Sequence, residues 1–129
     1  MKDQGKVLLV EDSEIDVFIH RRVISKSGLS NEIQQFPTGK LALEYLSKLE
    51  HINDVPALIF LDIRMPDMDG FEFLKEFEFL PEWIRKEIRI VMLSSTIDAL
   101  ELAEARGNKF VLAFIPKPLS VEKIKELFE

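Results

Sequence analysis

The sequence predicts an α/β fold in which a five-stranded parallel sheet carries helices on both faces. Short apolar segments that end in polar residues alternate with longer segments whose apolar residues recur at helical spacing. One apolar segment, residues 57–61, runs unbroken between Pro56 and Asp62, as expected of a strand buried on both faces. With 129 residues and 47% hydrophobic composition, the chain is long enough for one core. We therefore expect a single domain over residues 1–129.

Five segments are expected to form the strands. Four of them are compact apolar runs, whereas the segment 31–36 has only Ile33 and Phe36 as apolar anchors and is expected at an edge of the sheet. Parallel strands need a crossover between them, and the intervening helical segments supply it. The predicted strands are Lys6–Val10, Asn31–Phe36, Ala57–Leu61, Ile88–Leu93 and Phe110–Ile115.

Capping residues indicate where the helices begin and end. Ser13 and Ser95 are each followed three residues later by an aspartate, which is the spacing of a capping box. Gly28 and Gly107 are expected to end these two helices, because glycine readily adopts the left-handed conformation found there. Three further helices are expected to begin near Thr38, Gly70 and Ser120.

Two helical segments have distinctive apolar patterns. In the first helix, Ile15, Phe18 and Ile19 fall on one face, as in an amphipathic helix. In the segment 70–80, phenylalanine and glutamate alternate as in a strand, yet the apolar residues also form a helical stripe. We predict a helix, because a crossover must follow a parallel strand. The charged segment 81–87 is expected to connect it to the next strand.

Composition excludes several classes of protein. The net charge of −6 argues against nonspecific binding to nucleic acid or to an anionic membrane. No apolar run approaches the roughly 20 residues of a membrane span. The absence of cysteine removes disulfides and thiolate metal sites and suits the cytoplasm, which is the expected location.

Chemically active side chains follow four of the predicted strands. Glu11 and Asp12 come after the first strand, Asp62 after the third, Ser94 after the fourth and Lys117 after the fifth. Because the carboxyl ends of parallel strands share one edge, these groups are expected to converge there. Three carboxylates repel one another, and Mg²⁺, which prefers oxygen ligands, would relieve that repulsion.

The same set of groups is suited to phosphoryl transfer. A carboxylate can accept a phosphoryl group as an acyl phosphate, and a bound Mg²⁺ neutralises the charge of that group. A hydroxyl and an ammonium can then hold the phosphoryl oxygens. We therefore expect Asp62 to be phosphorylated, Glu11 and Asp12 to bind Mg²⁺, and Ser94 and Lys117 to contact the phosphoryl group.

These motifs resemble the receiver domain of two-component response regulators. The resemblance covers essentially the whole chain, and the order and spacing of its motifs are specific. It implies a flavodoxin-like three-layer α/β/α fold with strand order 2-1-3-4-5. It also implies a receiver that stands alone, without an effector domain. The motifs are Val10-Glu11-Asp12, Leu61-Asp62-Ile63-Arg64-Met65-Pro66 with Gly70, Leu93-Ser94-Ser95, and Phe114-Ile115-Pro116-Lys117-Pro118.

The resemblance also implies roles for individual residues. The backbone carbonyl of Arg64 would join Glu11, Asp12 and Asp62 as a Mg²⁺ ligand, and Asp62 would be the phosphoacceptor. In addition, the resemblance implies a cis peptide between Lys117 and Pro118.

Switching and partners are implied in the same way. Ser94 would hydrogen-bond a phosphoryl oxygen. Phe114, at a position where the family often has tyrosine, would swing inward. The face made by the fourth helix, fifth strand and fifth helix would then change its affinity for an unidentified target protein. The phosphoryl donor would be a histidine kinase or a histidine phosphotransfer protein docking near residues 15–22. His20, on this helix, is expected to be solvated or structural, and to face a partner rather than to belong to a site. Apart from its own phosphorylation and autodephosphorylation, the chain is not expected to be an enzyme.

A calcium-binding loop is one alternative. The segment 65–76 places Asp67, Asp69, Gly70 and Glu76 at the third, fifth, sixth and twelfth positions of an EF-hand loop. Met65 stands at the first ligand position, however, and offers no hard oxygen. Calorimetry would identify such a site as Ca²⁺ affinity that survives the loss of Asp62.

Two further alternatives use the same residues. A small Mg²⁺-dependent phosphohydrolase would also form an aspartyl phosphate, but the second residue after Asp62 is Arg64 and no long insertion is available to cap a substrate pocket. A degenerate receiver would act as an unphosphorylated interaction module. The five residues Glu11, Asp12, Asp62, Ser94 and Lys117 are all present, which favours the phosphoacceptor.

Overall fold

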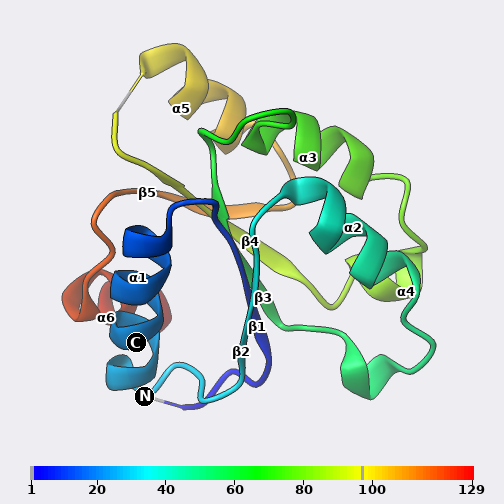
Figure 1. The fold of residues 1–129 in the computed structure, drawn as a ribbon, viewed down its shortest axis with the longest axis horizontal. Helices are drawn as coiled ribbons and strands as arrows, with labels where there is room; N and C mark the ends of the chain where they lie inside the picture. Colours follow the sequence, from blue (N-terminus) through cyan, green and yellow to red (C-terminus); the bar gives the residue numbers. More distant parts are fainter. Residues whose placement is uncertain (1, 97) are drawn as a thin grey trace.

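A twisted parallel sheet lies between two layers of helices (Figure 1). The structure is a computed structural model that describes residues 2–96 and 98–129. The strand order is β2-β1-β3-β4-β5, and every neighbouring pair is parallel, which confirms the predicted fold. The strands are β1 (Val7–Val10), β2 (Ile33–Phe36), β3 (Leu58–Asp62), β4 (Arg89–Ser94) and β5 (Val111–Pro116).

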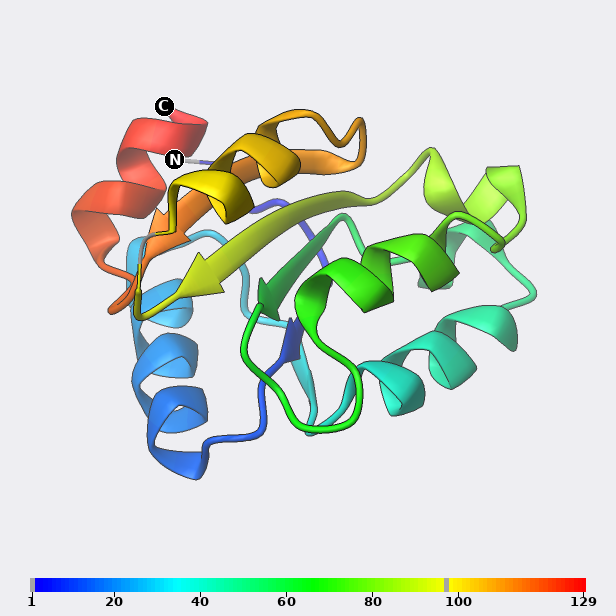
Figure 2. The same cartoon turned by 90° about the horizontal axis from the view of Figure 1, so that it is seen from above.

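The helices divide between the two faces of the sheet. Figure 2 shows α1 and α6 on one side and α2 and α3 on the other. Within the described ranges, no helix combines the length and the apolar character needed to cross a membrane. The helices are α1 (Glu14–Ser27), α2 (Gly39–Ser47), the 3₁₀ turn η1 (Ile52–Asp54), α3 (Gly70–Phe77), α4 (Glu82–Arg85), α5 (Ala99–Arg106) and α6 (Val121–Phe128).

Each face of the sheet has its own hydrophobic core. Along β3, Ile59 and Leu61 pack toward α2, α3 and α5, whereas Leu58 and Phe60 pack toward α1 and α6. Because successive side chains of a strand point to opposite faces, an uninterrupted apolar run is what two cores require. All five residues of β3 are buried, including Asp62 at its carboxyl end.

The start of α5 differs from the prediction. Ser95 does not cap the helix; Asp98 does, accepting hydrogen bonds from the backbone N–H groups of Leu100 and Glu101. Ser95 follows Ser94, whose hydroxyl closes a turn with Thr96, so the chain becomes helical only after that turn. Aspartate is also among the strongest N-cap residues.

The two predicted helix ends behave differently. Gly28 ends α1 in the left-handed conformation, with φ of 83°, as predicted. Gly107 ends α5 in the right-handed conformation, with φ of −81°, so glycine's freedom is not used there. The charged segment 81–87, which was predicted only as a connection, contains the one-turn helix α4.

The first helix presents its most apolar stripe to solvent. Ile15 and Phe18 are 73% and 62% exposed, and Ile19 is also exposed. The buried face of α1 instead contains His20 and Ile24. The prediction that His20 faces a partner is therefore wrong: its side chain lies inside the protein and is 1% exposed.

Candidate functional site

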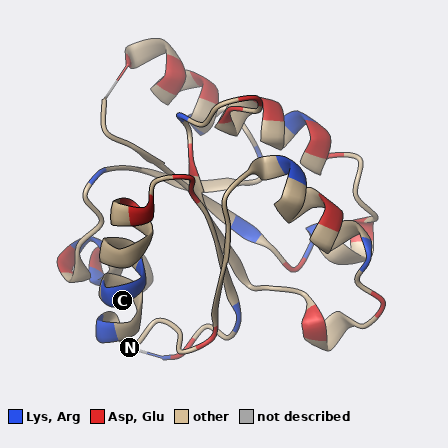
Figure 3. Cartoon of the chain, in the orientation of Figure 1, with Lys and Arg blue, Asp and Glu red and all other residues tan. Residues whose placement is uncertain are grey.

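Three carboxylates meet where β1 and β3 end. Glu11 and Asp12 follow β1, Asp62 ends β3, and one carboxylate oxygen from each lies within 4.8 Å of the others. The pairing of Val10 with Leu61 places the ends of the two strands side by side. Figure 3 shows the resulting acidic segments at this edge of the sheet. Glu11 and Asp62 are buried, whereas Asp12 is exposed.

Lys117 brings a positive charge into this acidic cluster. Its Nζ atom lies 2.7 Å from Glu11 Oε1, 2.8 Å from Asp16 Oδ2 and 3.3 Å from Asp62 Oδ2. The backbone N–H of Lys117 donates to the carbonyl of Ser94, which fixes the lysine beside the end of β4. The peptide between Lys117 and Pro118 is cis, as expected. The predicted convergence of residues from β1, β3 and β5 is therefore present.

Burial and charge alter the ionisation of this cluster. Burial raises the pKa of Glu11 to about 7, although the hydrogen bond from Lys117 acts in the opposite direction. Burial alone would lower the pKa of Lys117, but its hydrogen bonds to Asp16 and Glu11 outweigh that effect and raise it. The Lys117 ammonium thus contacts three carboxylates, and with Asp12 added the cluster of described residues retains an excess of negative charge.

The donor set fits a hard divalent cation. Mg²⁺ takes oxygen ligands in octahedral geometry and usually combines a few carboxylates with water. Glu11, Asp12 and Asp62 offer such oxygens around one point. Across residues 2–96 and 98–129, no hydrogen bond ends on the carbonyl of Arg64, so this group is available as a further ligand. The Arg64 N–H donates to Asp62 Oδ1 over 3.2 Å, which orients the aspartate.

Gly70 fixes the loop that holds Arg64. Its N–H donates to the carbonyl of Ile63, and a Cβ atom at this position would lie 3.0 Å from the Cα atom of Ile63. Only glycine avoids this backbone contact. Asp69 and Glu72 then close a capping box at the start of α3.

Ser94 lies at the end of β4 and is fully buried. Its hydroxyl donates to the carbonyl of Thr96 over 2.6 Å and accepts from the N–H of Thr96 over 3.2 Å. In this structure the hydroxyl is therefore engaged in a local turn beside the acidic cluster.

The Arg64 side chain links two loops at the site. Its Nη2 atom lies 2.6 Å from Glu101 Oε1 of α5 and 3.3 Å from Thr96 Oγ1. The loop after β3 is thereby tied to the loop after β4. The Arg64 side chain could not be assigned a role from the motif, because nothing in it shows where the guanidinium reaches; only the Arg64 carbonyl was predicted to take part in the site.

Phe114 is half-buried in β5 and packs against the core beneath α3 and α5. A pocket of about 340 Å³ lies next to it, lined in part by Leu102, Ala105 and Arg106 of α5. The aromatic ring therefore has a neighbouring space on the face that is predicted to change on switching.

Two residues of α1 at this site were missed. Asp16 was interpreted as part of a capping box with Ser13, but only the Ser13 side chain caps the helix, and Asp16 turns to Lys117. His20 lies one turn further along the same face. Burial lowers the pKa of His20, as does the charge of Lys117, and among the described residues its Nδ1 atom has no hydrogen-bond partner. The spacing of four residues between Asp16 and His20, which places them on one helix face, was the available sequence signal.

The calcium-loop alternative receives no support from the geometry. The segment 65–76 follows strand β3 rather than a helix, and the Asp69 side chain is used to cap α3. A residue at the fifth ligand position would need that oxygen free to bind the ion.

The fold and the carboxylate-lysine cluster define a signalling receiver, and comparison with known proteins agrees. Residues 7–129 match the family described as response regulator receiver domain. The chain is 33% identical, over 129 residues, to the probable methanogenesis regulatory protein FilR2 of Methanothrix harundinacea (strain 6Ac), covering 99% of this chain and 81% of that protein. It is 26% identical to sporulation initiation phosphotransferase F of Bacillus subtilis (strain 168), and the match covers 94% of this chain and 88% of that protein. The chain therefore belongs to the response regulator receiver domain family of two-component signalling.

Similar domains occur in longer proteins and in solved structures. The chain is 32% identical to part of the aerobic respiration control sensor protein ArcB of Escherichia coli (strain K12), and spans 14% of it. A response regulator receiver protein from Dyadobacter fermentans DSM 18053 superposes with a TM-score of 0.84 and 33% identity, covering 95% of this chain and 94% of that one. A two component response regulator from Cytophaga hutchinsonii superposes with a TM-score of 0.89 and 27% identity, covering 98% of this chain and 95% of that one.

Proposed function

We propose that the chain is a phosphoacceptor that receives a phosphoryl group on Asp62 from a phosphohistidine of a histidine kinase or histidine phosphotransfer protein. The observation that carries this proposal is the position of Asp62, within 4.8 Å of two further carboxylates and 3.3 Å from Lys117 Nζ. This arrangement joins a nucleophile, a cation-binding oxygen set and a fixed positive charge. All three are needed for transfer of a charged group.

In the transfer step, an Asp62 carboxylate oxygen forms a bond to phosphorus as the nitrogen–phosphorus bond of the donor breaks. The electron pair of that bond returns to the imidazole. A Mg²⁺ ion held by Glu11, Asp12, Asp62 and the Arg64 carbonyl would supply charge neutralisation at the transferring oxygens. Lys117 pairs with Asp62 in the resting protein and pairs with a phosphoryl oxygen after transfer.

The signal would then pass through Ser94. Its hydroxyl leaves Thr96 and donates to a phosphoryl oxygen, which opens the turn at residues 94–96. That turn is tied to α5 through Arg64 and Glu101, so its movement changes the position of α5. Phe114 can then move into the adjacent space. The face made by α5, β5 and α6 then changes its affinity for a downstream protein. This is the face predicted from the sequence, because α5 and α6 are the helices that were predicted as the fourth and the fifth.

The exposed stripe of α1 suits the docking of a donor. Ile15, Phe18 and Ile19 lie on the helix that begins directly after the Glu11–Asp12 turn. The guanidinium of Arg22 lies 5.6 Å from the centre of the Phe18 ring. An apolar helix pair with acidic flanks would cover this stripe and bring its phosphohistidine to Asp62.

The test is phosphorylation by acetyl phosphate with Mg²⁺, followed by intact-protein mass spectrometry. We expect one added phosphoryl group on the native chain and none on Asp62→Asn. Asp67→Asn is the matched control, because Asp67 is an exposed aspartate in the following loop and asparagine tolerates its φ of 68°. An unlabelled native chain would support the interaction-module alternative. Sustained hydrolysis of small phosphomonoesters would support the phosphohydrolase.

A further inference from the structure

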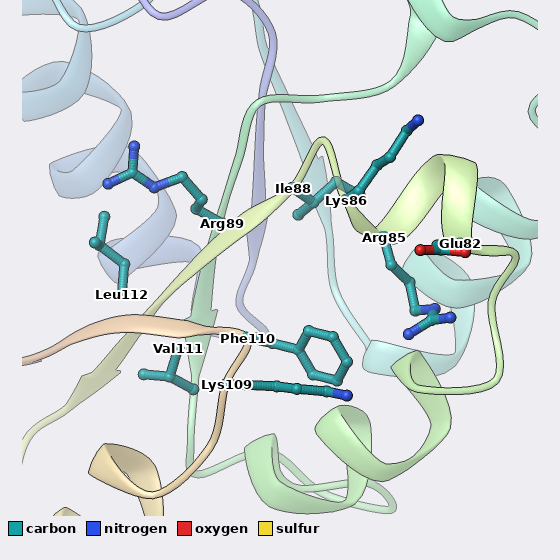
Figure 4. A pocket seen from close by; sticks show the side chains of 9 residues that line it. All are labelled: Glu82, Arg85, Lys86, Ile88, Arg89, Lys109, Phe110, Val111 and Leu112. Carbon is teal, nitrogen blue, oxygen red and sulfur yellow. The ribbon is translucent and has the colours of Figure 1, made fainter.

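A second candidate site lies at the opposite edge of the sheet from Asp62. A pocket of about 440 Å³ is formed where β4 and β5 begin, beside the end of α4 (Figure 4). It is separated from the acidic cluster by the length of β4, which is about 17 Å for a strand of this size. Four basic side chains line it: Arg85, Lys86, Arg89 and Lys109.

Among the described residues, these four cations have no carboxylate partner. Within residues 2–96 and 98–129, none of them forms an ion pair, and Glu82 is the only acidic residue that lines the pocket. The chain as a whole has a net charge of −6, so this local excess of positive charge opposes its general character. Uncompensated cations around a concave surface attract anions and accelerate their association.

Phe110 provides an apolar surface between the cations. The guanidinium of Arg85 lies 5.9 Å from the centre of its ring, and the Nζ atom of Lys109 lies 5.2 Å away. Figure 4 shows this ring between the Arg85 and Lys109 side chains. Arg85 is held in place by donating from Nε to the carbonyl of Leu80 over 2.7 Å. Phe110 in turn packs edge-on against Phe77, with ring centres 5.1 Å apart.

The backbone of the pocket indicates which kind of anion it suits. Phosphate sites usually use free backbone N–H groups at a helix N-terminus. Here the helix end is the C-terminus of α4, and the backbone N–H groups of Lys86, Ile88, Arg89 and Phe110 are already donated to protein acceptors. Recognition of an anion here must therefore come from the side-chain cations and from an aromatic surface. This combination suits carboxylates carried on a peptide more than a compact phosphate.

We propose that this basic pocket docks an acidic segment of a partner protein, whose carboxylates pair with Arg89, Lys86 and Lys109 while an apolar side chain packs on Phe110. Because the pocket lies away from the acidic cluster, docking leaves Asp62 accessible to a donor. The partner would be held in both phosphorylation states, and this proposal does not depend on the phosphoacceptor function.

The probe is a short fluorescein-labelled peptide of glutamates around a central phenylalanine, titrated into the 15N-labelled full chain. We expect saturable amide shifts centred on Arg89, Lys109 and Phe110, of equal size in native protein and Asp62→Asn. The double variant R89E/K109E should weaken binding at least about tenfold, and R89Q/K109Q should weaken it less; salt at about 0.5 M should abolish it. The control K40E/K125E reverses two exposed lysines on other surfaces and should leave affinity unchanged.

Several results would overturn the proposal. Shifts spread over all lysines and arginines, or centred on Arg21 and Lys26 of α1, would show nonspecific or displaced binding. An equal loss of affinity in K40E/K125E would show the same. Binding of inorganic pyrophosphate at the pocket without binding of the peptide would identify a phosphate site instead. Concentration-dependent shifts in the same residues without peptide would identify a second copy of the chain as the occupant.

Discussion

Lys117 and Glu11, which are 106 residues apart in the sequence, place Nζ and Oε1 2.7 Å apart at the carboxyl edge of the sheet. The pair is nearly buried, with 12% and 1% of the two side chains exposed. It fixes the lysine beside Asp62, where, among the described residues, one ammonium contacts several carboxylates. The stability and the ion affinity of the domain should therefore depend on this lysine in opposite directions.

Replacing Lys117 with methionine should destabilise the metal-free protein. The change leaves buried carboxylates without a cation, and breaking a buried ion pair from one side costs roughly 3–5 kcal/mol. The same change should increase Mg²⁺ affinity, because a competing cation has been removed, and should slow phosphorylation. Urea unfolding and isothermal titration calorimetry measure the two effects. Lys125→Met, at an exposed position of α6, is the control. Equal stability of the two variants would contradict this prediction.

Glu11 should make the metal-free protein less stable as pH rises. Its pKa is 4.5 in the unfolded reference and about 7 in the folded protein. Between these values the folded state retains a proton that the unfolded state has released. The contribution of Glu11 to the free energy of unfolding is therefore greatest below pH 4.5 and falls until pH 7. The loss is up to about 3 kcal/mol.

Two measurements isolate the Glu11 contribution. Carboxyl-carbon NMR should give a midpoint near 7 for Glu11 without Mg²⁺ and a lower one with it. In addition, the difference in unfolding free energy between the native chain and Glu11→Gln should depend on pH in the window from 4.5 to 7. A difference that stays constant across this window would refute the assignment.

His20 should act in the opposite sense. Burial lowers its pKa below the ordinary 6.5, so the unfolded chain takes up a proton first as the solution is acidified. Stability from this group is complete above pH 6.5 and is lost as pH falls toward the folded value. His20→Leu should remove that dependence, and at pH 7 it should cost little, because the Nδ1 atom has no partner among the described residues. Thermal melts of the native chain and of His20→Leu at several pH values would test this. If the melting temperature of the variant fell with acid as steeply as that of the native chain, the prediction would be wrong.

The Arg64–Glu101 contact should matter more for loop dynamics than for stability. Arg64 is 53% exposed, and exposed ion pairs contribute no more than about 1 kcal/mol. A double-mutant cycle with Arg64→Ala and Glu101→Ala should give a coupling energy in that range. Hydrogen exchange at Thr96 and Asp98 should nevertheless accelerate, because the loop after β4 loses its tie to Arg64. Unchanged exchange rates would show that the contact does not restrain the loop.

The strands and the acidic cluster could be predicted from sequence for a physical reason. A short unbroken apolar run such as residues 58–61, bounded by Pro56 and Asp62, is typical of a strand covered on both faces, and the parallel arrangement then brings Glu11 and Asp62 to one edge. The orientation of α1 could not be predicted, because an apolar stripe on Ile15 and Phe18 does not say whether it faces the core or solvent.

Local rules also failed where tertiary contacts compete. Asp16 has the spacing of a capping-box residue, but Lys117, 101 residues later in the chain, offers its carboxylate a charged donor. Ser95 likewise lost its capping role to Asp98. Such choices depend on which distant groups arrive nearby, and spacing along the sequence does not contain that information.

The most direct test of the phosphoacceptor function is peptide mapping by mass spectrometry after treatment of the native chain with acetyl phosphate and Mg²⁺. The predicted result is a single modified peptide with the phosphoryl group on Asp62, lost in Asp62→Asn and on chelation of Mg²⁺. A phosphoryl group on any other residue, or labelling that persists in Asp62→Asn, would contradict the assignment.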